Sequence, residues 1–161
     1  VPVCLETEEV IMIELSIIEK ADTPAAWLEQ FKAYAGIADN AQDSLLQAIL
    51  SKAVLSVQQK ADRSLIACTF ELREDEVEDC RVRLYQTVSQ VVSVRDGQGR
   101  VEYWEQVGNK VKVFANSAIV TYRTEPHLAD IDTLLPIVYQ YATALYDGED
   151  SKTLASILTQ C

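Results

Sequence analysis

The side chains that most often perform chemistry are few and scattered in this sequence. His127 is the single histidine, and no nucleophile or orienting acid lies close to it in the chain. A general base needs both partners within hydrogen-bonding reach, so catalysis by His127 is not expected. Glu102 and Glu105 belong to a segment with strand-like alternation, where an odd spacing places two carboxylates on opposite faces. This pair therefore does not suggest acid–base catalysis.

Metal and phosphate sites are also not indicated. The cysteines stand at positions 4, 68, 80 and 161, without a paired motif, so we expect no zinc site and read them as reduced thiols of a cytoplasmic product. The run Asp96-Gly97-Gln98-Gly99 lacks the spacing and the late glutamate of a calcium loop, and a hairpin turn is favoured. The sequence contains no phosphate loop or dinucleotide fingerprint. We predict a non-enzymatic protein with no catalytic residue, no metal and no cofactor.

Charge defines one candidate surface. The net charge is −11, which disfavours general binding to phosphate backbones. Six of the nine residues from Glu71 to Asp79 are acidic. Such blocks are usually solvated loops. The alternative is an acidic wall that DNA passes without sticking, lined by Glu74, Asp75, Glu76 and Glu78.

Size and hydropathy favour one domain over residues 1–161 with a sizeable core, since 48% of the residues are hydrophobic. The longest apolar run, at 10–18, is short for a membrane span and is interrupted by Glu14. Acidic residues precede that run, which argues against a secretory signal. We assign residues 1–20 to an extended N-terminal segment.

A helical pair is predicted over residues 23–62. Thr23 and Pro24 form a start signal and Gly36 a stop signal for the first helix. Asp39, with Gln42 three residues later, indicates a capping box for the second. The second helix carries an apolar stripe of 3.6-residue period, which comprises Leu45, Leu46, Ile49, Leu50, Ala53, Val54 and Val57.

A β-rich block is predicted over residues 68–124, as an antiparallel meander of about four or five strands. In the strand that begins at Val101, one face would carry Tyr103 and Val107 and the other Trp104. C-terminal helices fill residues 128–161, with the large helix beginning properly at Pro136 and Ser151 capping a short last one. The predicted fold class is α+β, with the C-terminal helix packing back on the N-terminal pair.

Two further surfaces are candidates for contact with other proteins. The second helix presents amides and few charges opposite its stripe, at Gln47, Ser51, Leu55 and Gln58. Such a face is either solvated or packed on a neighbouring subunit. The C-terminal helices carry aromatic and aliphatic residues for a partner contact, at Tyr139, Tyr146, Leu154 and Leu158. The tyrosines could equally form a core edge with their phenols reaching water.

The order of these blocks resembles the gp6-like head–tail connector (adaptor) family of tailed bacteriophages. The segment D-x-LL-x-A-I-L at 43–50 is similar to that family's opening helices, and LP-x-V-Y-x-Y-A-x-A-L-Y-D at 135–147 to its closing helix. The resemblance covers roughly residues 15–150. The β-rich block is longer than in the smaller members, and the acidic run at 71–79 has no counterpart in the family plan.

The resemblance implies a structural virion protein of the neck. It would form a ring of about twelve copies between the portal and the tail or stopper protein. The ring would continue the DNA channel without binding DNA specifically or contacting a membrane. Host cytoplasm would be its location during assembly. The alternatives are another neck or tail-completion protein, or an acidic intracellular module that inhibits a partner by imitating nucleic-acid charge.

Overall fold

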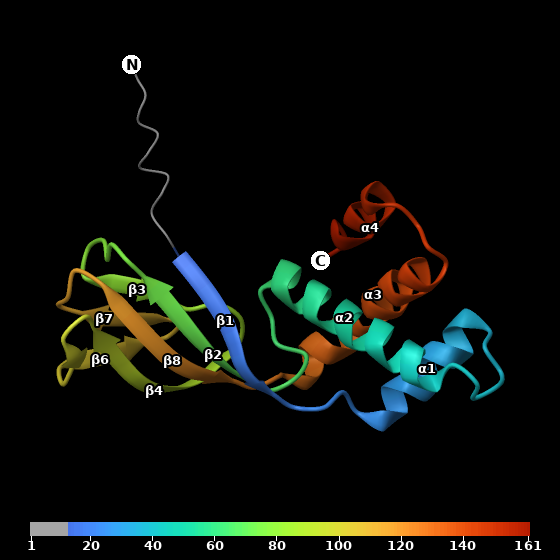
Figure 1. Cartoon of the computed structure of the whole chain (residues 1–161), viewed down its shortest axis with the longest axis horizontal. Helices are drawn as coiled ribbons and strands as arrows, with labels where there is room; N and C mark the ends of the chain where they lie inside the picture. The colour runs from blue at the N-terminus through green and yellow to red at the C-terminus, as the bar shows by residue number, and fades with distance from the viewer. Residues whose placement is uncertain (1–12) are drawn as a thin grey trace, which may run out of the picture. The chain divides into compact units, whose positions relative to one another are not determined.

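The computed structural model describes residues 13–161, which divide into a β-rich unit and a helical unit (Figure 1). The β-rich unit comprises 13–20 and Ala67–Glu125, and the helical unit comprises Ala21–Ile66 and Pro126–Cys161. Each unit is therefore built from two separate segments of the chain. The α+β class expected from the sequence is confirmed.

The larger sheet of the β-rich unit has five antiparallel strands. In spatial order these are β1 (Ile13–Lys20), β2 (Cys68–Glu74), β8 (Ala118–Thr124), β4 (Val88–Asp96) and β5 (Gly99–Arg100). The order differs from a simple meander because β8 lies between β2 and β4. Part of the expected N-terminal extended segment, residues 13–20, is an edge strand of this sheet, since its backbone pairs along the whole length of β2.

The smaller sheet has three antiparallel strands, in the order β3 (Arg81–Arg83), β7 (Lys110–Val113) and β6 (Trp104–Val107). The core of the unit combines buried side chains from both sheets: Phe70, Leu72, Val120 and Tyr122 from the larger one, and Val82, Val111 and Val113 from the smaller one. Phe70 and Tyr122 stack with ring centroids 5.5 Å apart. The Tyr122 hydroxyl also donates to the carbonyl of half-buried Tyr85 at 3.3 Å, so the polar end of this buried side chain has a partner.

The helical unit contains α1 (Ala25–Ala35), α2 (Asp43–Ala61), α3 (Leu128–Tyr146) and α4 (Ser151–Leu158). α3 packs against α1 and α2, and α4 packs against α3, so the expected return of the C-terminal helix onto the N-terminal pair is confirmed. The buried apolar side chains of the unit include Trp27, Phe31, Leu46, Leu50, Val54, Val57, Leu134, Val138 and Ala142. The stripe predicted for α2 is thus largely correct, except that Leu45 is exposed.

The ends of α1 and α2 follow the sequence signals only in part. Gly36 closes α1 in the left-handed region at φ 75°, as predicted. The capping box at Asp39 is wrong: its carboxylate accepts from the N–H of Ala41 at 3.0 Å, and α2 begins at Asp43 with Gln42 before it. Asp43 is instead held by buried Lys32, whose Nζ lies 2.7 Å from its carboxylate oxygen. That hydrogen bond raises the pKa of Lys32.

The starts of α3 and α4 differ from the prediction as well. α3 begins at Leu128, and Pro136 lies inside it. A proline leaves the carbonyl four residues earlier without a helical donor, and here that carbonyl belongs to Asp132, an exposed residue. The cap of α4 is Asp150 and not Ser151, because the Asp150 carboxylate accepts from the N–H of Thr153 at 2.8 Å. This bond lowers the pKa of Asp150.

Candidate assembly surfaces

The face of α2 predicted to meet a neighbouring subunit is partly covered within the helical unit. Gln47, Ser51 and Leu55 are half-buried, so each still presents some side-chain surface to solvent. Gln58 is only 1% exposed, and its assignment to this surface is wrong. A candidate contact on α2 therefore comprises Gln47, Ser51 and Leu55 alone.

Gln58 has a structural role at the C-terminal end of α2. Asp62 ends the helix in the left-handed region at φ 54°. Three and four residues later, the backbone N–H groups of buried Leu65 and Ile66 both donate to Oε1 of Gln58, at 2.9 and 3.3 Å. Buried backbone donors need such partners. Nothing in the one-letter pattern distinguishes this amide from its exposed neighbour Gln59.

The tyrosines of α3 also separate into two kinds. The Tyr139 side chain is buried, so its assignment to a partner contact is wrong. Its hydroxyl donates to Oε1 of Gln30, and burial raises its pKa to about 12. Tyr146 lies at the exposed end of the helix, and its hydroxyl donates to Oε1 of Gln42 at 2.8 Å. Tyr146 therefore remains available to a partner.

The two leucines predicted on the last helix are half-buried. Leu154 and Leu158 flank Ile157, which is the buried apolar residue of α4. Leu158 lines a shallow hollow of about 370 Å³ with residues of the C-terminal half of α2, namely Ser56, Gln59 and Lys60. The remaining apolar surface of α4 is thus small and lies beside a polar rim.

The predicted acidic lining forms an ordered turn between β2 and β3. Asp75, Glu76 and Glu78 are exposed, whereas Glu74 is half-buried at the end of β2. Burial and, to a smaller extent, the charge of Glu78 raise the pKa of Glu74. The N–H of Val77 donates to the carbonyl of Asn116 at 2.8 Å, which ties the turn to the segment before β8. The structure therefore holds several carboxylates together on one exposed turn.

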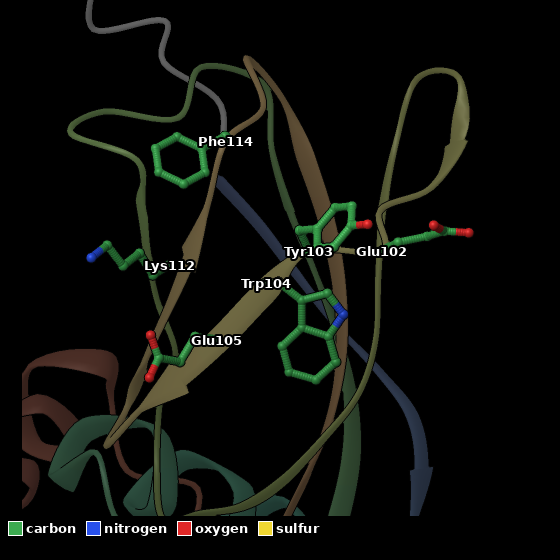
Figure 2. A pocket seen from close by; sticks show the side chains of 6 residues that line it. All are labelled: Glu102, Tyr103, Trp104, Glu105, Lys112 and Phe114. Atoms are coloured by element: carbon green, nitrogen blue, oxygen red, sulfur yellow. The ribbon is translucent and has the colours of Figure 1, made fainter.

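An aromatic surface on β6 and β7 was not identified from the sequence as a site. Tyr103 is 83% exposed and Phe114 78% exposed, and they flank a hollow of about 320 Å³. Figure 2 shows the side chains that line it: Glu102, Tyr103, Trp104, Glu105, Lys112 and Phe114. The alternation around Val101 already predicted that Tyr103 and Val107 share a face. The sequence pattern did not indicate that β6 pairs with β7. This pairing places Phe114 and Lys112 in the lining of the same hollow.

The edge strand β1 presents a second apolar surface. All eight of its residues are exposed, and Ile13, Leu15, Ile17 and Ile18 retain 37–54% of their accessible surface. The remaining positions are Glu14, Ser16, Glu19 and Lys20, and the pairing with β2 is irregular between Ile17 and Glu19. Charges and bulges protect the backbone of an edge strand from pairing, so the apolar side chains are the feature that a partner could contact. β1 is thus a candidate contact, although the sequence suggested only an extended segment there.

Among residues 13–161, neither a cluster of metal ligands nor a membrane-spanning helix is found. In that part of the chain, no group of three or more His, Cys, Asp or Glu side chains is placed to hold a metal ion. None of the helices described there is long and apolar enough to cross a membrane. The notable features are outward-facing: an apolar strand, an aromatic sheet face and an acidic turn. Such features are typical of proteins that work through contacts with other proteins.

Comparison with known proteins identifies the family. The model of the phage gp6-like head–tail connector proteins matches residues 25–123, so the chain belongs to this family and has a structural connector role. No curated protein matches the sequence.

Solved structures show the same fold. A chain of a native gene transfer agent virion has a TM-score of 0.65 at 14% identity and covers 91% of this chain and 93% of its own. A chain in the neck of the empty gene transfer agent particle, computed with C6 symmetry, scores 0.61 at 16% identity, covering 83% and 84%. A chain in the neck of the native particle, computed with C12 symmetry, scores 0.58 at 17% identity, covering 84% and 83%.

Proposed function

We propose that this connector protein forms a closed ring between a portal and a tail or stopper protein, in the neck of a virion, and that the ring continues the DNA channel. The match to the connector family over residues 25–123 carries the proposal. The neck structures with C6 and C12 symmetry support a cyclic arrangement by analogy of fold. About twelve copies would close such a ring, which assembles in the host cytoplasm and then resides in the virion. The role requires no bond-making chemistry.

The acidic turn is the proposed lining of the channel. Asp75, Glu76 and Glu78 are exposed on it, and Glu74 lies at its base. A positive lining would bind successive phosphates and slow the passage of DNA, because each phosphate contact adds affinity. Carboxylates repel the same phosphates, so DNA passes without being held. The net charge of −11 agrees with this arrangement.

The proposed contacts with other proteins lie on the helical unit. Gln47, Ser51 and Leu55 on α2 would face a neighbouring copy. Tyr146, Leu154 and Leu158 at the end of α3 and on α4 would face the portal or the tail protein. The surface on α2 has few charges, as the core of an interface does.

Electron microscopy of the purified protein mixed with its cognate portal tests the ring directly. We expect rings with the wild-type chain and at least about tenfold fewer with Leu55→Glu, because a carboxylate in the contact loses its hydration. Ala33→Glu adds the same charge at an exposed position of α1 and serves as the control. Absence of rings with the wild-type chain and portal would overturn the proposal. A tight one-to-one complex with a basic nuclease would favour the inhibitor-type alternative.

Circular dichroism separates assembly from folding in the same variants. The half-buried position of Leu55 lets a glutamate turn toward solvent, so the helical signal of Leu55→Glu should match that of the wild-type chain. If the signal is lost, Leu55 belongs to the core and the contact on α2 is refuted while the ring itself stands. Normal rings from a folded Leu55→Glu protein would refute the contact equally.

A further inference from the structure

The apolar inner face of the larger sheet continues onto β1, where the smaller sheet does not cover it. Leu15 pairs with Leu72 and Ile17 pairs with Phe70, so these side chains share one face of the sheet. Leu72 and Phe70 are buried, whereas Leu15 and Ile17 stay 37% and 43% exposed. The core of the β-rich unit is therefore left incomplete at its edge.

The aromatic surface on β6 and β7 has matching chemistry. Alternation along β7 places Lys110, Lys112 and Phe114 on the exposed side, and the pairing of β6 adds Val107 opposite Lys110. Tyr103 extends this exposed side in the segment before β6. Exposed aromatic and aliphatic side chains gain free energy when a neighbour removes them from water. The face thus combines exposed apolar side chains with two lysines and one carboxylate, Glu105, which lies opposite Lys112.

The two surfaces differ in their balance of charge. Glu74 and the acidic turn outnumber Lys20 on the β1 side, and Lys110 and Lys112 outnumber Glu105 on the β6–β7 face. Glu74 stands directly opposite Ile13 on the uncovered side of β1 and β2, and the acidic turn continues from it. The other surface carries Lys110 and Lys112 from β7 and one carboxylate, Glu105 of β6, opposite Lys112. Both surfaces belong to the β-rich unit but to different sheets, and Figure 1 shows β1 and β6–β7 in different parts of that unit. A cyclic ring needs two different complementary surfaces on each copy.

We propose that the uncovered side of β1 in one copy packs against the exposed face of β6–β7 in the next copy around the ring. The occupant of each surface is a second copy of this chain, and the contact completes the open edge of the β-rich core. This inference rests on the proposed ring and adds the surfaces that close it. When this contact is repeated around a closed ring, the β1 surface and the β6–β7 face of each copy are each used once.

Thiol cross-linking in assembled rings tests the pairing. Leu15→Cys and Phe114→Cys are combined in a chain whose Cys4, Cys80 and Cys161 are replaced by serine, and rings formed on the portal are treated with a short bis-maleimide. We expect a ladder of covalent multimers from the double variant. Each single variant alone should remain monomeric on a denaturing gel, whereas rings mixed from the two should give dimers. This pattern arises only from a contact between unlike surfaces.

The outcomes are distinct. Rings without cross-linked chains refute the pairing and leave the ring intact. Multimers from Leu15→Cys alone would show β1 against β1, and cross-links to the portal would give β1 a different occupant; both overturn the inference. Absence of rings with the wild-type chain overturns the proposed function and, with it, this contact.

A substitution pair adds a readout without cross-linker. Leu15→Lys places a charge on the uncovered side of β1, and Ser16→Lys places the same charge on the opposite side of the strand, opposite Glu71. We expect at least about tenfold fewer rings from Leu15→Lys, with circular dichroism unchanged, and normal rings from Ser16→Lys, because only the first charge is buried by the neighbour. Equal effects of the two variants would contradict the contact.

Discussion

Replacing Gln58 by leucine should destabilise the helical unit strongly, although the side chain looks like a surface amide in the sequence. Leucine has similar volume, so the substitution leaves no large cavity. It removes the acceptor of two backbone N–H groups, those of Leu65 at 2.9 Å and Ile66 at 3.3 Å. Both residues are buried, so water reaches these donors poorly.

The expected loss follows from those two bonds. Leaving a buried donor unsatisfied costs about 1–3 kcal/mol. The bond to Leu65 has a normal length and the bond to Ile66 is long, so together we expect about 3 kcal/mol. That is a large fraction of the roughly 5–15 kcal/mol by which a domain is stable. The amide protons of Leu65 and Ile66 should also exchange faster with solvent.

Urea unfolding followed by fluorescence measures this loss. Trp27 is buried in the helical unit, and Trp104→Phe removes the only other tryptophan, so the signal reports that unit alone. Gln59→Leu is the matched control, because Gln59 is the exposed neighbour on the same helix, and it should change stability by less than about 0.5 kcal/mol. If Gln58→Leu and Gln59→Leu unfold within about 0.5 kcal/mol of each other, the role assigned to the Gln58 amide is wrong.

Two further predictions concern hydrogen-bonded side chains of the helical unit. Tyr139→Phe removes the hydroxyl that donates to Gln30 and should cost about 1 kcal/mol in urea unfolding, within the usual range for one bond. Burial raises the pKa of Tyr139 from 10.0 to about 12, so the folded state favours the neutral phenol. The stabilisation of the fold by this preference should disappear as pH rises from about 10 to about 12. An ultraviolet titration in which every tyrosine ionises near 10 would contradict this prediction. The pKa of Asp150 is lowered by the N–H of Thr153, so the cap of α4 stabilises the fold above the ordinary value of 3.8 and is lost as pH falls through the lowered pKa. The protection of the α4 amides, expressed relative to their intrinsic exchange rates at each pH, should decrease across that range in the wild-type chain and stay constant in Asp150→Asn, which lacks the titrating carboxyl.

Local patterns predicted much of the helical unit. The 3.6-residue period in α2 identified buried Leu46, Leu50 and Val54, and Gly36 marked the end of α1. Both signals are short-range, because a helix repeats its contacts within a few residues. The hairpin at Asp96 was predicted for the same reason, and its carboxylate accepts from the N–H of Gln98 at 2.8 Å.

Long-range pairing explains most of what the sequence did not reveal. The position of β8 between β2 and β4 depends on contacts between residues about fifty positions apart, for which the local alternation of Ala118 to Thr124 carries no signal. Gln58 and Tyr139 were wrongly assigned to the surface. Residue type alone could not prevent this, because amides and phenols occur both at the surface and in the interior of proteins. Their partners, Leu65 and Gln30, identify them only after the chain has folded. The proposed contacts on α2 and β1 remain predictions.

The division of the chain into interleaved segments limits how its parts can be exchanged between related genes. The backbone passes between the two units at 20–21, 66–67 and 125–126. A recombination that replaced Ala67–Glu125 alone would separate β2 from its native partner β1. The β2 of the inserted segment would then have to pair with the β1 of the recipient chain. Successful swaps should therefore carry the first strand together with the inner block, or else preserve the backbone register between them. Single substitutions of exposed residues do not disturb the pairing of β1 with β2. Such substitutions can therefore change the preference for a partner while both units keep their folds.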